Sequence, residues 1–452
     1  MPTADHTSPG VRVYAVCSEV PPDVVGGLGR YAERIMDALR DTGAPVVVFG
    51  ATVRRGRAPR AERRGDVTLH RLPTPGYGPG EGSALPAGVR RLARIAGLFA
   101  FNVRAAARIL AAEAGRTGAV VAVHDWMGCV AGILCRVLGR LPVVFHVHTR
   151  ELNAPGMGRR SAYAVLLDLL ETAQARTARL ILVPSARMRD DLAARGWPAD
   201  RMVVVPHGFE EPALLRLAGL PGGERDRVRA EVRRRYLPGG QGRLVVFAGR
   251  PSPHKGVGTL IRAVPRVAAE HGDVRCVLIG APAPQTGDAA TVARLIERTQ
   301  TGAHVVAGNR FLAPAEVFAH FLAADACVFP SVYEPFGLVA VEAMALARPV
   351  VVGPGYSPEV VGDGAVRCAR DDPGELAEAL LRLLGDPGEA DRLALRGAAY
   401  VRERYSWART ARHTLEAYES AARPRRERGL TTAGPPRGGQ PMRRGSVRGP
   451  RT

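Results

Sequence analysis

Residues 119–148 read AVVAVHDWMGCVAGILCRVLGRLPVVFHVH. Ala119–His124 and Pro142–His148 are short runs rich in valine, and the apolar segment Gly128–Leu138 between them has the length of a helix. Short apolar strands that alternate with longer helices are typical of right-handed βαβ units and a parallel sheet. The stretch therefore predicts an α/β fold.

The same alternation extends along most of the chain but breaks once, within 207–243, where charged residues are flanked by glycine and proline. We therefore predict two doubly wound, Rossmann-like domains that face each other across a cleft, over 1–206 and 207–405. Ligands of open α/β sheets bind outside the carboxyl ends of the strands, so the cleft is the expected site. The final segment, 422–452, is rich in Arg, Gly and Pro and is expected to be a disordered tail.

Composition narrows the class of protein. The chain has 452 residues, 46% of them hydrophobic and 23% charged, which excludes a wholly disordered, collagenous or coiled-coil protein. No run of 18 uncharged apolar residues indicates a membrane-spanning helix, and the scattered cysteines suit reduced thiols in a cytoplasm. The net charge of +20 can attract nucleic acid, anionic lipid or phosphorylated ligands, but no nucleic-acid-binding module is visible.

The stretch Glu334–Ala347, EPFGLVAVEAMALA, predicts a helix that begins beside a ligand. From its first glycine onward Glu342 is the only polar side chain, and a buried carboxylate is costly unless it is hydrogen-bonded. Glu342 is either favoured by the helix dipole or accepts two hydrogen bonds from a vicinal diol such as a ribose. Glu334 would reach a group attached to an anion at the helix start. Three backbone N–H groups would bind that anion: those of Phe336, Gly337 and Leu338.

A second stretch, Leu244–Gly258, reads LVVFAGRPSPHKGVG. Its predicted strand is followed by a loop that places two cations, Arg250 and Lys255, before a helix. Cations beside a helix N-terminus suit a diphosphate, although most arginines of this chain are expected to be exposed surface charges. Lys255 is the only lysine among the 63 basic residues, which indicates that a compact ammonium is required there.

Polar residues also follow the strands of the first half. The glycine loop Val24–Tyr31, VVGGLGRY, is either a simple turn or a place where the backbone approaches a phosphate or sugar. His124 and Asp125 end one predicted strand, and the motif FHVHTRE ends the next with His148 and Glu151. Three histidines at adjoining strand ends could suggest a metal, but no supporting cysteine follows, so a polar ligand-binding cluster is preferred. No D-x-D pair follows a strand, and we expect no metal-held diphosphate.

Together, the motifs RPSPHKG, from Arg250, and EPFGLVAVEAM, from Glu334, resemble the retaining GT-B glycosyltransferases of family 4. That family includes bacterial glycogen synthases, sucrose synthases and phosphatidylinositol mannosyltransferases. The resemblance covers roughly residues 11–420, and it includes the early GGLG, the later HDW and VPS, the closing YSW and the order of all motifs.

The resemblance implies specific roles on the donor side. Arg250 and Lys255 would hold the diphosphate of a nucleotide-sugar, which is a substrate and not a cofactor. Glu334 would bind hydroxyls of the transferred sugar and Glu342 the ribose, and the backbone of Gly27 would lie near the phosphate.

It also implies an acceptor side in the first domain. His148 matches the family's strand-end histidine, which contacts the sugar and the acceptor, with His124, Asp125 and Glu151 nearby. The closing helix, about 406–421, would pack back on the first domain.

Three features depart from the family's pattern. Val25 replaces the lysine that glycogen synthases place before GGLG, His207 replaces the usual asparagine after the boundary strand, and the turn Pro354–Glu359 is atypical. The first two argue against a glycogen synthase proper, and the third leaves the donor sugar open.

The sequence thus predicts metal-independent transfer of a sugar from an NDP-α-sugar to the hydroxyl of a small soluble acceptor, with retention of configuration, in the cytoplasm. Alternatives stay open: a lipid or polysaccharide acceptor at the membrane surface, an epimerase or phosphorylase of the same fold, and a non-catalytic basic protein that binds nucleic acid or anionic membrane. The basic helix expected over 89–115 leaves peripheral contact with an anionic membrane open.

Overall fold

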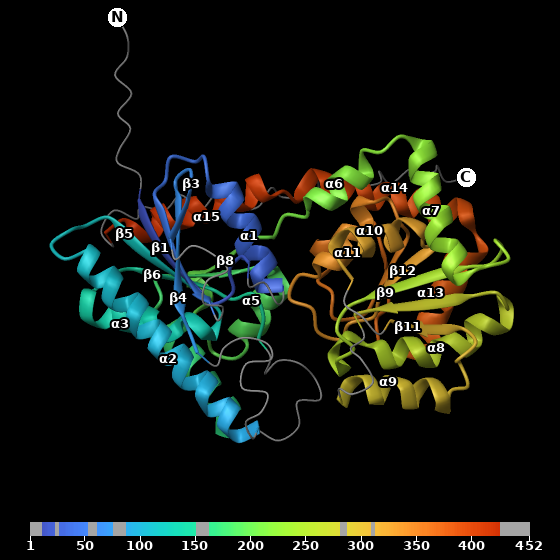
Figure 1. Cartoon of the computed structure of the whole chain (residues 1–452), viewed down its shortest axis with the longest axis horizontal. Helices are drawn as coiled ribbons and strands as arrows, with labels where there is room; N and C mark the ends of the chain where they lie inside the picture. Colours follow the sequence, from blue (N-terminus) through green and yellow to red (C-terminus); the bar gives the residue numbers. More distant parts are fainter. Residues whose placement is uncertain are drawn as a thin grey trace, which may run out of the picture. The chain divides into compact units, whose positions relative to one another are not determined.

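Two β-sheets, one of eight strands and one of six, organise the part of the chain that the structure describes (Figure 1). The structure is a computed structural model that describes residues 11–22, 27–52, 61–75, 87–150, 162–280, 287–308 and 312–424. The elements of the first half are β1 (Arg12–Cys17), α1 (Gly27–Leu39), β2 (Val46–Thr52), β3 (Ala61–Arg64), β4 (Val67–Pro73), α2 (Ala87–Ala112), β5 (Ala119–His124), α3 (Cys129–Gly139), β6 (Val143–His146), α4 (Ala162–Thr177), β7 (Leu180–Val183), α5 (Ala186–Ala193) and β8 (Met202–Val204).

The first sheet has the strand order β3-β4-β2-β1-β5-β6-β7-β8. Its strands pair in parallel from β4 to β8, but β3 is antiparallel to β4 at the edge. The sequence predicted a parallel sheet, and the short, charged β3 adds an antiparallel strand at its edge. The strand order reverses between β1 and β5, so the loops after these two strands flank the crevice of the sheet.

The elements of the second half are α6 (Pro212–Ala218), α7 (Gly222–Tyr236), β9 (Leu244–Ala248), α8 (Val257–Glu270), β10 (Arg275–Ile279), α9 (Gly287–Arg298), β11 (Val305–Ala307), α10 (Pro314–Ala323), β12 (Ala326–Phe329), α11 (Leu338–Ala345), β13 (Val350–Val352), α12 (Pro358–Val361), β14 (Val366–Arg367), α13 (Pro373–Gly385) and α14 (Pro387–Arg404). Its sheet is parallel in the order β11-β10-β9-β12-β13-β14, which is the Rossmann order with a reversal between β9 and β12.

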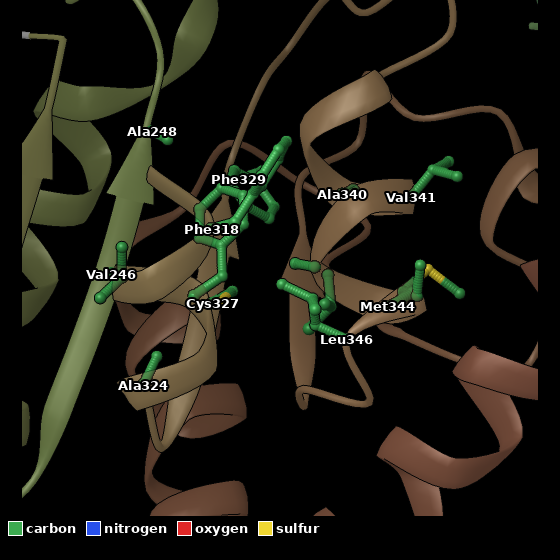
Figure 2. Close-up of a cluster of buried hydrophobic side chains, with 14 of the residues drawn as sticks. Val246, Ala248, Phe318, Ala324, Cys327, Phe329, Ala340, Val341, Met344 and Leu346 are labelled. Carbon is green, nitrogen blue, oxygen red and sulfur yellow. The ribbon is translucent and has the colours of Figure 1, made fainter. Parts of the chain in front are cut away.

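Apolar side chains fill the space between each sheet and its helices. In the second half, Val246 of β9 and Cys327 of β12 pack with Phe318 of α10 and Met344 of α11, and all four are buried (Figure 2). Strands covered on both faces must be apolar throughout, which explains the continuous runs such as LVVFA. The two sheets and their helices confirm the predicted fold of two Rossmann-like domains.

The last helix, α15 (Trp407–Ala422), packs against α1 and the first sheet although it follows the second half in the chain. Its buried side chains include Trp407 and Tyr418, and the hydroxyl of Tyr418 lies 2.9 Å from Nε2 of His146. The chain therefore passes between the halves twice, once after β8 and once before α15.

Candidate active site

The loop after β9 approaches the loop after β12 at the reversal point of the second sheet. Lys255 ends a short 3-10 turn, and Gly256 follows in the left-handed conformation with φ of +69°. A Cβ atom at Gly256 would lie 2.0 Å from the carbonyl oxygen of Pro330, so only glycine lets the loops come this close. This approach brings Lys255 to the residues that follow β12.

Lys255 and Glu334, two residues predicted to bind the donor, form an ion pair. The Nζ atom of Lys255 lies 2.6 Å from Oε2 of Glu334, and the hydroxyl of Ser331 donates to the same oxygen over 3.2 Å. The Glu334 side chain is 8% exposed and that of Lys255 is 22% exposed, so the pair is mostly withdrawn from water. Arg250 is exposed at the end of β9 and has no ion pair with a described residue.

The start of α11 presents backbone donors next to this pair. Among the described residues, no acceptor takes the N–H groups of Phe336, Gly337 or Leu338. Gly337 has φ of +91°, and a Cβ atom there would lie 2.2 Å from the ring of Tyr356 and 3.0 Å from Cγ of Glu334. Glycine therefore lets the helix start pack directly on Glu334, as the predicted anion site requires.

Tyr356 belongs to the turn that departs from the family pattern. Its side chain is fully buried against Gly337, and its hydroxyl has no hydrogen-bond partner among the described residues. Burial raises the pKa of Tyr356 well above its usual value, so the hydroxyl is a neutral donor near Glu334 and Glu342. Sequence reasoning placed this turn near the donor sugar but did not single out Tyr356.

Glu342 is 1% exposed and pairs with a residue of the first half that sequence reasoning did not assign to the site. The guanidinium of Arg30, in the first turn of α1, donates to Oε1 of Glu342. Burial raises the pKa of Glu342, and the charge and hydrogen bond of Arg30 oppose that shift. The pair joins the helix after the glycine loop to the helix that carries the predicted ribose ligand.

Glu211, which follows β8, holds Arg30 from the other side. Its Oε1 lies 3.3 Å from Nη2 of Arg30, and its Oε2 lies 3.2 Å from Nη2 of Arg34. The Glu211 side chain is also buried, so two carboxylates and two guanidinium groups form a compact charged cluster. The only sequence signal for this cluster was the single carboxylate of Glu342 in an apolar helix. The sequence did not indicate which cation would pair with it.

Four histidines lie where β5, β6 and β8 end: His124, His146, His148 and His207. Nδ1 of His124 lies 3.0 Å from Nε2 of His148, and Nδ1 of His148 lies 3.4 Å from Nε2 of His207. The ring of Tyr31, on α1, packs against these three imidazoles at centroid distances of 4.2–5.8 Å. The predicted pair His124 and His148 is thus brought together, and His207 extends it into a chain of imidazoles.

Burial keeps the imidazoles of His124, His148 and His207 uncharged. Desolvation lowers the pKa values of His124 and His207 to about 3, and it lowers the pKa of His148 well below its usual value. Each ring is therefore neutral at physiological pH and carries one N–H, so each can donate once and accept once along the chain.

Asp125 supports the loop of His148. Its Oδ1 accepts the backbone N–H groups of His148 over 2.7 Å and of Thr149 over 3.4 Å. Burial raises the pKa of Asp125 to about 8. Asp125 thus positions the loop that the prediction placed on the acceptor side, while Glu151 lies outside the described residues.

Gly27 is the first residue of α1 and is exposed, with no atom within 4 Å of the place where a Cβ would stand. The close backbone approach expected there involves no neighbouring protein atom. Its implied role near a phosphate stays a prediction.

One group in the described part of the chain has the ligands for a metal ion. Ring nitrogens of His124, His146 and His148 lie within 4.8 Å of one another. Zinc binds three such nitrogens at about 2.0–2.1 Å each, which would require the rings to move together. In the structure their nitrogens bond to each other and to Tyr418 instead. The expected absence of a metal stays a prediction.

Each half of the chain matches a known protein family. Residues 26–208 match the model of the family described as "Glycosyl transferase 4-like domain", and residues 242–386 match that of "Glycosyl transferases group 1". The chain belongs to the GT-B glycosyltransferases of the family 4 type.

Several relatives match over almost the whole chain. The α-maltose-1-phosphate synthase of Mycolicibacterium smegmatis is 30% identical over 91% of this chain and all of its own length. The MMP α-(1→4)-mannosyltransferase of Mycolicibacterium hassiacum is 31% identical over 88% of this chain and 95% of its own. A glycogen synthase of Mycobacterium tuberculosis is 28% identical over 92% and 96%. The protein is therefore an enzyme of the glycosyltransferase class.

Solved structures share the fold. The sucrose-phosphate synthase of Thermosynechococcus elongatus is 22% identical, with a TM-score of 0.67 over 90% of this chain and 98% of that one. The catalytic domain of starch synthase IV from Arabidopsis thaliana is 15% identical, with a TM-score of 0.69 over 91% and 99%. Both support the two-domain GT-B architecture.

Proposed function

We propose that the protein transfers a sugar from an NDP-α-sugar to an acceptor hydroxyl, with retention of the α configuration and without a metal. The Lys255–Glu334 ion pair beside the unpaired amides at the start of α11 carries this proposal. A cation and a carboxylate held together at the strand reversal suit a ligand with a phosphate next to sugar hydroxyls.

On the donor side, Lys255 and the amides of Phe336–Leu338 would stabilise the charge that develops on the departing diphosphate. The ammonium of Lys255 has three N–H donors, so it can keep its bond to Glu334 and still donate to a phosphate oxygen. Glu334 would then accept hydroxyls of the sugar, and Glu342, held by Arg30, would accept those of the ribose. Because α11 carries both the amides and Glu342, one helix would align the phosphate with the ribose.

On the acceptor side, His148 would orient the attacking hydroxyl as a neutral imidazole, with the hydroxyl replacing His207 at Nδ1, where the present contact is 3.4 Å long. Its low pKa prevents it from carrying a stable positive charge, so the proton of the hydroxyl would pass to the leaving phosphate on the same face. That front-face route leads to retention. The side chain of Asp125 would keep the His148 loop in place during the reaction.

We propose a small phosphorylated or hydroxylated molecule as acceptor. Two relatives carry names of this kind: α-maltose-1-phosphate synthase and, at 30% identity over 88% of this chain, the D-inositol 3-phosphate glycosyltransferase of Kineococcus radiotolerans. All six cysteines are free and buried, which suits the reducing cytoplasm proposed as the compartment.

A panel of NDP-sugars tests the proposal. One donor should raise the melting temperature, and addition of acceptor should release free NDP from that donor in the presence of EDTA. The proton NMR coupling of the product should show an α linkage. Glu334→Gln should abolish turnover, whereas Glu378→Gln, at an exposed ion pair of α13, should not. Conversion of the donor without acceptor would indicate an epimerase, and manganese-dependent recovery after EDTA would refute metal independence.

A further inference from the structure

Exposed apolar side chains concentrate on three neighbouring helices of the first half. Of the thirteen large hydrophobic side chains that are exposed in the described residues, nine lie on α2, α3 and α4. They are Val89, Leu92, Phe99, Val103, Val137, Leu138, Val165, Leu166 and Leu169. We call this set the apolar face. Isolated exposed hydrophobics are normal, but a gathering of this kind marks an interaction surface.

The three helices form one layer. Their inner sides share a single core cluster with one face of the first sheet, and α3 packs against both α2 and α4. Helices α2 and α3 lie side by side in Figure 1. On α2, Val89, Leu92, Phe99 and Val103 recur at intervals of three, seven and four residues, which places them on one side of the helix. Phe101, by contrast, is fully buried in the core.

This arrangement explains why α2 has the composition of a membrane-spanning helix although it packs on the first sheet. The segment Leu92–Ala112 is long and apolar enough to cross a membrane by length and composition, although no run of 18 uncharged residues predicted one. A third of that segment is buried, because its inner side packs on the sheet while its outer side forms part of the apolar face. The helix thus lies along the protein surface with apolar groups on two sides.

The charges around the apolar face are almost all positive. The sequence of α2 contains five arginines and no acid, and α3 contains one arginine and no acid. On α4, Asp168 and Glu171 both pair with the buried Arg150, which offsets one of their two negative charges. Arg104 and Arg108, one turn apart on α2, are exposed beside the apolar stripe.

We propose that the apolar face and its arginines dock on an anionic lipid bilayer. Apolar side chains that enter the interface and cations that meet anionic headgroups are the two features that peripheral membrane binding uses. A second copy of this chain would bring two arginine-rich surfaces together, and a nucleic acid would leave nine apolar side chains without a partner.

Sedimentation of the full chain with lipid vesicles tests this proposal. The protein should bind vesicles of phosphatidylglycerol and phosphatidylcholine and should bind pure phosphatidylcholine much more weakly. Leu92→Ser with Phe99→Ser should weaken binding to the anionic vesicles about tenfold or more. The matched control is Leu215→Ser with Leu395→Ser, which removes two side chains of similar exposure from the second half and should leave binding unchanged.

Charge variants test the second feature. Arg104→Gln with Arg108→Gln should weaken binding to anionic vesicles roughly fivefold for each arginine. Arg409→Gln with Arg412→Gln, on α15 at the opposite face of the sheet, is the control. Since the segment beyond Ala422 is itself basic, the same comparisons are repeated in a chain that ends there, where the differences should persist.

Three outcomes would overturn the proposal. Equal binding of the Leu92/Phe99 variant and its control would show that the apolar face does not meet lipid. In a second outcome, the full chain would fail to bind vesicles and would form a dimer. If light scattering then showed that the Leu92/Phe99 variant is a monomer, the apolar face would be assigned to a second copy of the chain. Binding to RNA that depends on Arg104 and Arg108 but not on Phe99 would assign the cations to nucleic acid.

Discussion

Removal of the Arg30 side chain is expected to lower the free energy of unfolding, because the buried carboxylate of Glu342 then loses its cation. The side chain of Glu342 is 2% exposed, and Arg30 is the only cation that contacts it among the described residues. Loss of one partner of a buried ion pair costs about 3–5 kcal/mol. Because the Arg30 side chain is itself 30% exposed, we expect Arg30→Met to cost about 3 kcal/mol near pH 8.

The cost should depend on pH in a defined direction. Burial raises the pKa of Glu342 in the folded protein, and Arg30→Met removes the two contributions that lower it. Between the pKa of the unfolded chain and the higher pKa of the folded variant, the folded state binds more protons, so stability falls as pH rises. The variant should therefore lose up to about 1.4 kcal/mol for each pH unit in that window and approach wild-type stability in acid.

Thermal and urea unfolding of the full chain between pH 5 and pH 8.5 measures this effect. Arg34→Met is the matched control, since Arg34 lies one turn further along α1 and pairs with Glu211 but not with Glu342. The double variant Arg30→Met/Glu342→Gln should recover stability at pH 8, because no carboxylate then stays unpaired. An Arg30→Met cost that is the same at both ends of the pH range, or no larger than that of Arg34→Met, would refute the reasoning.

Three further predictions concern turnover. Lys255→Arg should lower kcat about 100-fold, because the wider guanidinium displaces the phosphate by about 1 Å, and wild-type kcat would contradict the need for a compact ammonium. His148→Ala should lower kcat far more than donor affinity, measured as KM and by donor-induced thermal stabilisation; normal kcat with a large loss of melting temperature would make it a core residue. Deletion of the residues after Ala422 should leave kcat and KM unchanged, and a stable but inactive truncated enzyme would contradict this.

The alternation of strands and helices was sufficient to predict both domains. Continuous valine-rich strands such as 119–124 and 244–248 are explained by sheets covered on both faces, and their spacing fixes the order of the elements. Because parallel strands end at the same edge of a sheet, residues that follow successive strands meet in space. That rule brought His124 to His148 and Lys255 to Glu334, although 79 residues separate the second pair.

The contacts between the halves could not be predicted in this way. Arg30 and Glu342 lie 312 positions apart, and no periodicity states which of the many arginines neutralises a given carboxylate. His207 was noted only as a departure from a family pattern, because its place beside His148 depends on how the chain leaves β8. The antiparallel pairing of β3 was not predicted, since its four residues, AERR, include three charged side chains and carry little strand signal.

The two ion pairs of the site, Arg30–Glu342 and Lys255–Glu334, differ in which halves of the chain they join. Arg30 and Glu342 come from different halves, so their bond can form only when the helix after the glycine loop meets α11. Lys255 and Glu334 come from adjacent loops of one sheet, so their bond depends on that half alone. A bound diphosphate would meet Lys255 already oriented by Glu334, whereas Glu342 is held in place only while Arg30 is near. Under the proposed function, the contact of Lys255 with the phosphate therefore depends on the second half alone, and full engagement of the ribose requires both halves.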